Sequence, residues 1–282
     1  MDPCLNEHID IRPGMVIHGY TILSKTGSGY QGTIWKSTNS AGDFKSSAGD
    51  FYALKVITIG GTECKKLKKE VDSEIKYLER LTPLCGNVNC YKESFVYGNS
   101  IILVSDFING KELDSYKIHQ LPENWVQSLM CTLYKIHSLG VVHADIKGPN
   151  ILLDEDTQKP VFVDFGLSMC ISEKCSIRGT PRYIAPEIID PDSNPIGLDI
   201  FALGITILFI LLPDLPFPDG KLPGIKGKRF PDSYWIENTQ NKISMAILSQ
   251  SEKKIARIVS QLIEFNPEKR IDNFNKLVKK MC

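Results

Sequence analysis

The sequence predicts an α+β fold in two lobes, with strands in the first third of the chain and helices in most of the rest. Three runs rich in β-branched and aromatic residues are typical of strands: 20–25, 32–38 and 51–58. Residues 63–82 change to the spacing of an amphipathic helix, with charged residues between the apolar ones. After Gly110 helical spacing dominates. We therefore expect a β-rich lobe with one key helix, followed by a mostly helical lobe.

The same patterns give the other expected elements and the domain boundaries. Two more strands are expected at 94–97 and 101–107, and three helices at 125–139, 198–212 and 252–265. We expect an extension at 1–19 and one domain at 20–281, with a first lobe at about 20–105, a connection at about 106–112 and a second lobe at about 113–281. The sequence Ser-Ala-Gly-Asp-Phe occurs at 40–44 and again at 47–51, which predicts an extended hairpin loop.

The composition argues against several classes of protein. The chain contains 33 Lys and Arg and 33 Asp and Glu, so its charge gives no reason to expect a nucleic acid or an anionic membrane as a partner. The longest apolar run, 201–212, is too short to cross a bilayer, so we expect no membrane insertion. The first residues lack the apolar core of a signal peptide, and we expect an intracellular protein of the cytoplasm or nucleus.

The eight cysteines do not indicate a metal site. Their spacing is irregular and no Cys-x-x-Cys pair occurs, which argues against structural zinc. Because intracellular compartments keep thiols reduced, we expect these cysteines to be reduced.

A glycine-rich stretch at 27–34 lies between the first two expected strands. Glycines at this spacing let backbone amides approach phosphate oxygens, because no Cβ stands in the way. A plain β-hairpin and a dinucleotide-binding loop share this pattern. The β-branched and aromatic residues from Thr33 to Lys36 favour a second strand over the helix that a dinucleotide-binding loop requires.

A lysine stands inside the apolar strand pattern Ala53-Leu54-Lys55-Val56. An ammonium group in such a strand is costly unless it is paired, although an edge-strand lysine that reaches solvent is a common alternative. Glu74 follows on the inward face of the expected helix. We expect Lys55 and Glu74 to form an ion pair that positions the ammonium group for phosphate.

Carboxylates and an amide recur at close spacing in the second lobe. The run His143-Ala144-Asp145-Ile146-Lys147-Gly148-Pro149-Asn150 is followed by Asp164-Phe165-Gly166. Carboxylate and amide oxygens suit Mg²⁺, and a carboxylate also serves as a general base. Each residue alone is common in turns, but their joint order and spacing indicate a catalytic site.

These motifs resemble the protein kinase family from about Tyr20 to Met281. The match includes, in order, the glycine-rich loop, the strand lysine, the helix glutamate, the catalytic loop, Asp-Phe-Gly and an Ala-Pro-Glu motif at 185–187. The resemblance implies the bilobal protein kinase fold and an active enzyme. It also implies ATP with Mg²⁺ as the cofactors, with Mn²⁺ as an alternative metal.

The resemblance implies a role for each matching residue. Asp145 would orient and deprotonate the substrate hydroxyl, and Lys147 would contact the γ-phosphate. Asn150 and Asp164 would bind the metal ions. The residues implied for nucleotide binding are Gly27, Ser28, Gly29, Tyr30, Gly32, Ile34, Ala53, Lys55, Glu74, Asp106, Ile108 and Leu152.

The segment 179–187 resembles the substrate-positioning loop of serine/threonine kinases, and Lys147 favours the same subgroup. Thr180 would hydrogen-bond to Asp145 and Lys147, which places it among the catalytic residues. Glu187 would form a buried ion pair with Arg270, and Asp199 would cap the backbone of the catalytic loop. The resemblance therefore implies protein substrates that are phosphorylated on serine or threonine.

Two positions depart from the family pattern. Ala144 replaces the arginine that in relatives binds a phosphate on the activation segment, so we expect activity without that phosphate. Gly148-Pro149 stands where many relatives have Pro-Glu, which weakens any expectation of a basic residue before the target site.

Two other functions use the same fold. A pseudokinase binds ATP or serves as a scaffold, but it usually lacks the residues equivalent to Lys55, Asp145 or Asp164, which are all present here. A small-molecule kinase shares the aspartates and the asparagine, but it generally lacks the peptide-docking motif at 179–187. Site residues, rather than fold, separate these possibilities.

Overall fold

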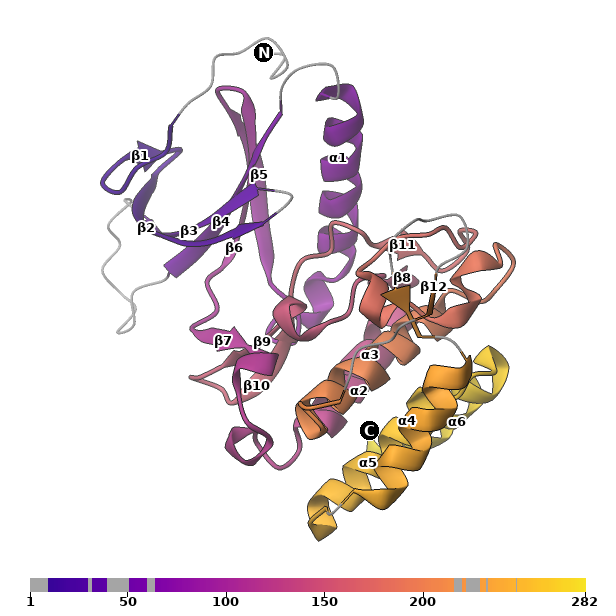
Figure 1. The fold of residues 1–282 in the computed structure, drawn as a ribbon. Coiled ribbons are helices and arrows are strands. Elements are labelled where there is room, and N and C mark those ends of the chain that lie inside the picture. Colours follow the sequence, from indigo (N-terminus) through magenta and orange to yellow (C-terminus); the bar gives the residue numbers. More distant parts are fainter. Residues whose placement is uncertain are drawn as a thin grey trace. The chain divides into compact units, whose positions relative to one another are not determined.

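The computed structural model describes residues 10–29, 32–39, 51–59, 64–215, 220–221, 229–231, 233–246 and 248–282. The chain divides into two compact units, the first ending at Asn109 and the second beginning at Gly110 (Figure 1). Tyr30 lies outside the described residues, as does the Ser-Ala-Gly-Asp-Phe duplication except for Phe51.

An antiparallel sheet forms most of unit 1. Its strand order is β1-β2-β3-β4-β6-β5. The strands are β1 (Val16–Ile17), β2 (Tyr20–Gly29), β3 (Gly32–Asn39), β4 (Phe51–Thr58), β5 (Tyr91–Tyr97) and β6 (Ser100–Asp106). The five strands expected from sequence are confirmed. The two-residue strand β1 is too short to show an alternating pattern, which is why the sequence did not predict it.

The helix expected in unit 1 is also confirmed, as α1 (Cys64–Arg80). It contacts β5 (Figure 1). One stripe of its residues, which includes Val71, Glu74 and Leu78, is buried. The core of the sheet lies on the face that carries Leu54, Val56 and neighbouring apolar residues. Because side chains alternate along a strand, Lys55 points to the opposite face.

Helices dominate unit 2 (Figure 1). They are α2 (Trp125–Ser138), α3 (Ile196–Leu211), α4 (Ser233–Met245), α5 (Gln250–Leu262) and α6 (Pro267–Met281). Helix α3 is buried along nearly its whole length, with α5 and α6 packed against it and α6 also packed against α2. The sequence predicted α2, α3 and α5, but not α4 and α6.

Short strands in unit 2 hold the loops that carry polar residues. A three-stranded sheet has the order β10-β9-β7, from β7 (Gly110–Glu112), β9 (Ile151–Asp154) and β10 (Lys159–Phe162). Two-stranded pairs join β8 (Val141–Val142) to β11 (Met169–Cys170), and β12 (Gly220–Lys221) to β13 (Arg229–Phe230). Strands of two to four residues are too short for periodicity to reveal. Among the described helices, none has both the length and the apolar character of a membrane span.

The structure contradicts the expectation that the cysteines are reduced. Cys85 is disulfide-bonded to Cys90, and Cys131 of α2 is bonded to Cys282 at the end of α6. The second pair is separated by 151 residues in sequence, so only the packing of α6 on α2 brings it together. Cys175 is a buried thiol, and burial beside Asp190 raises its pKa, which lowers its reactivity.

Replacing Cys282 with serine is expected to lower the free energy of unfolding by about 2–4 kcal/mol under non-reducing conditions. The disulfide to Cys131 restricts a long loop in the unfolded chain, so its loss gives the unfolded state more freedom. Denaturation in guanidinium chloride measures the change. Cys90→Ser opens only the short loop to Cys85 and should have a smaller effect. Equal stabilities of Cys282→Ser and wild type without reductant would contradict the prediction.

Candidate active site

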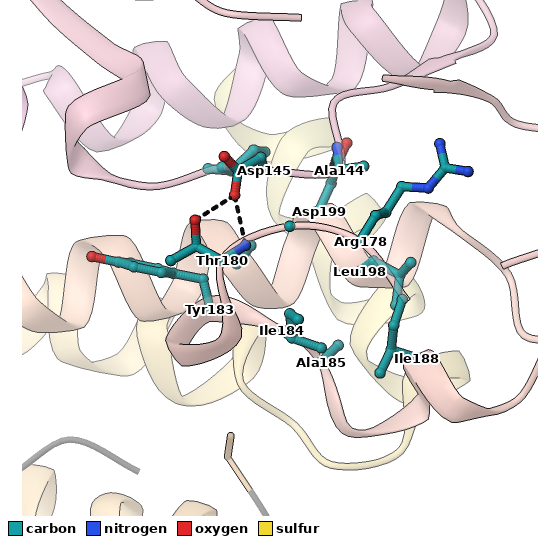
Figure 2. Close-up of a pocket in the computed structure, with 13 residues that line it drawn as sticks. Ala144, Asp145, Arg178, Thr180, Tyr183, Ile184, Ala185, Ile188, Leu198 and Asp199 are labelled. Atoms are coloured by element: carbon teal, nitrogen blue, oxygen red, sulfur yellow. Dashed lines mark hydrogen bonds between the residues drawn. The ribbon is translucent and has the colours of Figure 1, made fainter. Parts of the chain in front are cut away.

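The Asp145 carboxylate is the centre of a hydrogen-bond network in unit 2 (Figure 2). One oxygen, Oδ1, accepts hydrogen bonds from the backbone amide and the Oγ1 of Thr180, at 2.8 and 2.7 Å. The other, Oδ2, accepts from Lys147 Nζ at 2.8 Å and from Asn150 Nδ2 at 3.1 Å. Lys147 Nζ also donates to Thr180 Oγ1 at 2.9 Å. The structure therefore brings together the four residues predicted to be catalytic.

A buried carboxylate fixes the backbone of this loop. Asp199 of α3 is fully buried and accepts hydrogen bonds from the backbone amides of His143 and Ala144, each at 2.8 Å. Its Oδ2 also lies 2.9 Å from Nε2 of His137 on α2. Ala144 has a φ angle of 64°, a left-handed conformation that costs an L-residue roughly 1–2 kcal/mol. The two amide bonds to Asp199 help to offset this cost, which confirms the predicted cap.

Gly179 allows the segment after the catalytic loop to approach that loop closely. Its φ angle is 90°, and a Cβ atom at this position would lie 2.5 Å from the backbone oxygen of Ala144. Any larger residue would push the two backbones apart. Thr180 follows directly, so this glycine is what lets Thr180 reach Asp145.

Asp164 follows β10 and lies next to the catalytic loop through backbone contacts. The amide of Val163 donates to the backbone oxygen of Asn150 at 3.0 Å. Phe165 is fully buried, and its ring centre lies 4.7 Å from that of His143. Asp164 itself has a φ angle of 62°. Both neighbours of Asp164 are thus anchored, and the chain holds it in an uncommon conformation that is enriched at functional sites.

The side-chain amide of Asn150 is oriented by hydrogen bonds from its nitrogen. Its Nδ2 donates to the backbone oxygen of Asp145 at 2.9 Å as well as to the Asp145 carboxylate. Because the amide nitrogen is engaged in this way, its Oδ1 is the atom left to accept a cation. An amide oxygen and the Asp164 carboxylate form a hard donor set, which fits Mg²⁺ or Mn²⁺.

Unit 1 contains the predicted pair of Lys55 and Glu74. Lys55 Nζ lies 2.6 Å from Glu74 Oε1, and the side chains are 17% and 5% exposed. The register of the sheet places Lys55 opposite Ile34 on β3 and Leu103 on β6. A buried glutamate is stabilised by such a cation, and in turn it fixes the ammonium group in one place. The expected ion pair is confirmed.

The glycine-rich stretch is a β-hairpin between β2 and β3, in which Gly29 pairs with Gly32 and Ser28 with Thr33. A Cβ at Gly32 would lie 2.2 Å from the backbone oxygen of Val56, so strand packing alone requires this glycine. By contrast, a Cβ at Gly29 would meet nothing within 4 Å among the described residues. In the part of the chain that the structure describes, only Ile34 side-chain atoms, at 3.7 Å, would contact a Cβ at Gly27. Packing among the described residues therefore does not explain these two glycines, and none of those residues covers their open side.

Two of the residues predicted for nucleotide binding, Ile34 and Ala53, share the face of Lys55. Strand pairing places Ala53 opposite Ser105 and Lys36, and cross-strand partners point to the same side. Ile34, opposite Lys55, therefore lies on this face together with Ala53, and both are half-buried.

Three more residues predicted for nucleotide binding lie on strands or just after one. Asp106 ends β6, and its carboxylate lies 2.9 Å from Lys92 Nζ, while Ile108 is half-buried just after it. Leu152 belongs to unit 2, where it lies on β9 opposite Glu112. It is half-buried and only two residues from Asn150.

Comparison with known proteins decides the family. The model of the protein kinase domain matches residues 20–281, nearly the whole chain. The chain belongs to the protein kinase family. The α+β fold and the motifs expected from sequence agree with this membership.

Similar proteins include several serine/threonine-protein kinases. The kinase sid1 of Schizosaccharomyces pombe is 30% identical over 200 residues, which cover 68% of this chain and 40% of sid1. TAO3 of Xenopus laevis is 29% identical over 195 residues, or 66% of this chain and 21% of TAO3. A probable cAMP-dependent protein kinase catalytic subunit of Encephalitozoon cuniculi is 28% identical over 191 residues, or 65% of this chain and 59% of that protein. The chain thus spans less than two thirds of the length of these relatives.

The kinase domain also contains the expected ion pair between Glu187 of the substrate-positioning segment and Arg270. Glu187 contacts Arg270 of α6, whose guanidinium group is fully buried and also donates to the backbone oxygens of Gly197 and Glu264. Burial lowers the pKa of Arg270 to about 9, so the guanidinium group remains charged at neutral pH. This pair connects α6 to the segment that carries Thr180.

Asp114, which the sequence did not predict, places a carboxyl group beside the catalytic loop. A Cβ at Gly148 would lie 2.4 Å from the side-chain Cγ of Asp114, so the Asp114 carboxyl group occupies the space that a larger residue 148 would need. Partial burial raises the pKa of Asp114, and the pKa of Glu112 is raised by burial and by Asp114. An aspartate in a turn gives no distinguishing signal in a sequence, so only the structure reveals this position.

Proposed function

We propose that the chain is an active serine/threonine protein kinase, which transfers the γ-phosphate of ATP to serine or threonine hydroxyls of protein substrates. The observation that supports this most strongly is the contact of Lys147 and Thr180 with each other and with Asp145. The sequence relates this threonine and lysine to serine/threonine kinases, and curated relatives named as such are about 30% identical.

Asp145 acts as the general base in this proposal. The substrate hydroxyl gives its proton to the carboxylate while its oxygen bonds to the γ-phosphorus, and the bond from that phosphorus to the ADP oxygen breaks. Lys147 Nζ, 2.8 Å from Asp145 Oδ2, neutralises charge that develops on the transferred group. Thr180 keeps the carboxylate in one orientation through its two hydrogen bonds.

The proposed cofactors are ATP and a divalent cation. Asn150 and Asp164 would hold Mg²⁺ or Mn²⁺, which when bound neutralises phosphate charge. Lys55, fixed by Glu74, would bind phosphate oxygens of ATP. The open backbone at Gly27 and Gly29 would approach those phosphates, and Ile34, Ala53 and Leu152 would contact adenine.

We also propose that activity does not require phosphorylation of the activation segment. Ala144 offers no cation to a phosphate on that segment. In the unmodified chain, Thr180 already contacts Asp145, and β11 at the start of the segment already pairs with β8. These contacts support an arrangement that is complete without the modification.

Phosphate transfer from γ-labelled ATP tests the proposal. The full chain is incubated with Mg²⁺ and generic protein substrates, and phosphoamino-acid analysis identifies the labelled residue. We expect label on serine and threonine, and none with Asp164→Asn, which excludes a contaminating kinase. Phosphatase-treated protein should retain its activity.

Other outcomes would support the alternatives. ATP binding without transfer to any substrate would favour a pseudokinase. Transfer to a small molecule but not to proteins would favour a small-molecule kinase of the same fold.

A further inference from the structure

One arginine in the activation segment joins two of its distant parts. The guanidinium group of Arg178 donates from Nε and Nη2 to Ser176 Oγ, at 3.0 and 2.7 Å. Its Nη1 donates to the backbone oxygen of Leu167 at 3.3 Å. Leu167 follows Asp164-Phe165-Gly166 directly, whereas Ser176 lies nine residues later. A single side chain thus connects the beginning of the segment to the part that leads into Thr180.

The position of Arg178 links this connection to the active site. Arg178 immediately precedes Gly179 and Thr180, whose backbones lie against Ala144 and Asp145. Arg178 and Ala144 both border the pocket of Figure 2. At residue 144 a methyl group replaces a long cationic side chain, so this position offers no cation to the segment, and the loop's Lys147 contacts Thr180 instead. The cation at this edge of the pocket comes from the segment.

The contacts of the activation segment show which of its residues are anchored and which are weakly packed. Cys175 is anchored, because its amide donates to Pro191 O and its Sγ lies 3.1 Å from Ser193 O. Thr180 is anchored on Asp145. Between these anchors, Ile177 is 46% exposed and Ser176 is also exposed. The Arg178 bonds span this weakly packed stretch.

We infer that Arg178 is a positioning residue, which holds the unphosphorylated activation segment in the conformation that places Thr180 on Asp145. This inference rests on the proposed kinase activity and explains how that activity proceeds without a segment phosphate. Only a planar guanidinium group presents two donors to Ser176 and a third to Leu167 at once, so a lysine does not replace it. A threonine at residue 176 keeps the hydroxyl acceptor.

Steady-state kinetics of phosphatase-treated protein test this role. We expect Arg178→Lys and Ser176→Ala to lower kcat/KM for a protein substrate by about tenfold, the size of one lost charge-assisted contact. Ser176→Thr should stay within about twofold of wild type. KM for ATP should not change, because Lys55 and Glu74 lie outside the segment. General unfolding, by contrast, would change the kinetic constants for both ATP and the protein substrate.

Lys174→Ala is the matched control. Lys174 lies in the same segment and forms an exposed ion pair with Asp192, so its loss should change kcat/KM by less than about twofold. Wild-type kinetics in Arg178→Lys would overturn the inference. An unphosphorylated wild type that becomes active only when Ser176 carries phosphate would overturn it as well.

Thermolysin cleavage tests the same inference without using activity. The enzyme cuts before exposed leucine and isoleucine, and Leu167 and Ile177 are 37% and 46% exposed. We expect Arg178→Lys to be cut before Ile177 about tenfold faster than wild type and Lys174→Ala. If wild type transfers no phosphate, the proposed function fails, while this cleavage ratio still decides whether Arg178 holds the segment. Equal cleavage rates would show that it does not.

Discussion

Replacing Asp145 with asparagine is expected to reduce phosphate transfer by about 10³-fold, the middle of the range for loss of a general base. The carboxylate accepts four hydrogen bonds from side chains and backbone of Thr180, Lys147 and Asn150. An asparagine side chain has one oxygen and one NH₂ group in place of the two carboxylate oxygens. It therefore cannot take up the substrate proton, and its NH₂ group faces at least one of the groups that donate to the carboxylate in wild type.

The loss should fall on kcat rather than on ATP affinity. Lys55 and Glu74, which we propose to bind the nucleotide, form their own ion pair in unit 1. Labelled phosphate transfer gives kcat, and titration with a fluorescent ATP analogue gives affinity. Asp272→Asn is the matched control, because Asp272 is exposed on α6 and pairs with the exposed Lys276 four residues later. Activity of Asp145→Asn within tenfold of wild type would contradict the role of base.

The sequence predicted most of the site because the family motifs are local. The run 143–150 places Asp145, Lys147 and Asn150 in one short loop, and their mutual bonds follow once that loop closes. The pairing of Lys55 with Glu74 was also predictable, because a buried ammonium group in a strand requires a carboxylate partner. These predictions depended on residue chemistry and on short or fixed spacing.

What the sequence did not predict depends on packing between distant elements. The disulfide of Cys131 with Cys282 forms because α6 packs on α2, and neither cysteine lies in a recognisable motif. Helix α6 was not predicted from the sequence either, although Asn266 caps it and Pro267 begins it. Arg178 gave no signal either, since its three bonds depend on the path of the activation segment.

Replacing Arg270 with methionine is expected to lower the free energy of unfolding by about 3–5 kcal/mol, the cost of breaking a buried ion pair from one side. Glu187 would keep a carboxylate that is only 8% exposed and has lost its cation. Its Oε2 already lacks a hydrogen-bond partner within the described residues. The backbone oxygens of Gly197 and Glu264 would lose their donor too. Urea denaturation measures the change.

Lys276→Met is the matched control for this change. Lys276 lies on the same helix and pairs with Asp272 four residues earlier, with both side chains more than 60% exposed. Water screens that pair, so its loss should cost about 0.5 kcal/mol or less. Similar losses in the two variants would mean that burial does not set the strength of the Arg270 contact.

A double variant separates the attraction between the two charges from the cost of leaving one of them unpaired. In Glu187→Gln with Arg270→Met, neither member of this pair carries a buried charge, so we expect the protein to be more stable than Arg270→Met alone by about 1–3 kcal/mol. The neutral amide still lacks a partner for one of its atoms, which keeps the double variant below wild type. If the losses in free energy of unfolding from the two substitutions are instead additive, an unpaired Glu187 carboxylate does not destabilise the Arg270→Met variant. The cation would then stabilise the domain mainly through Gly197, Glu264 and its position 5.1 Å from the Phe201 ring.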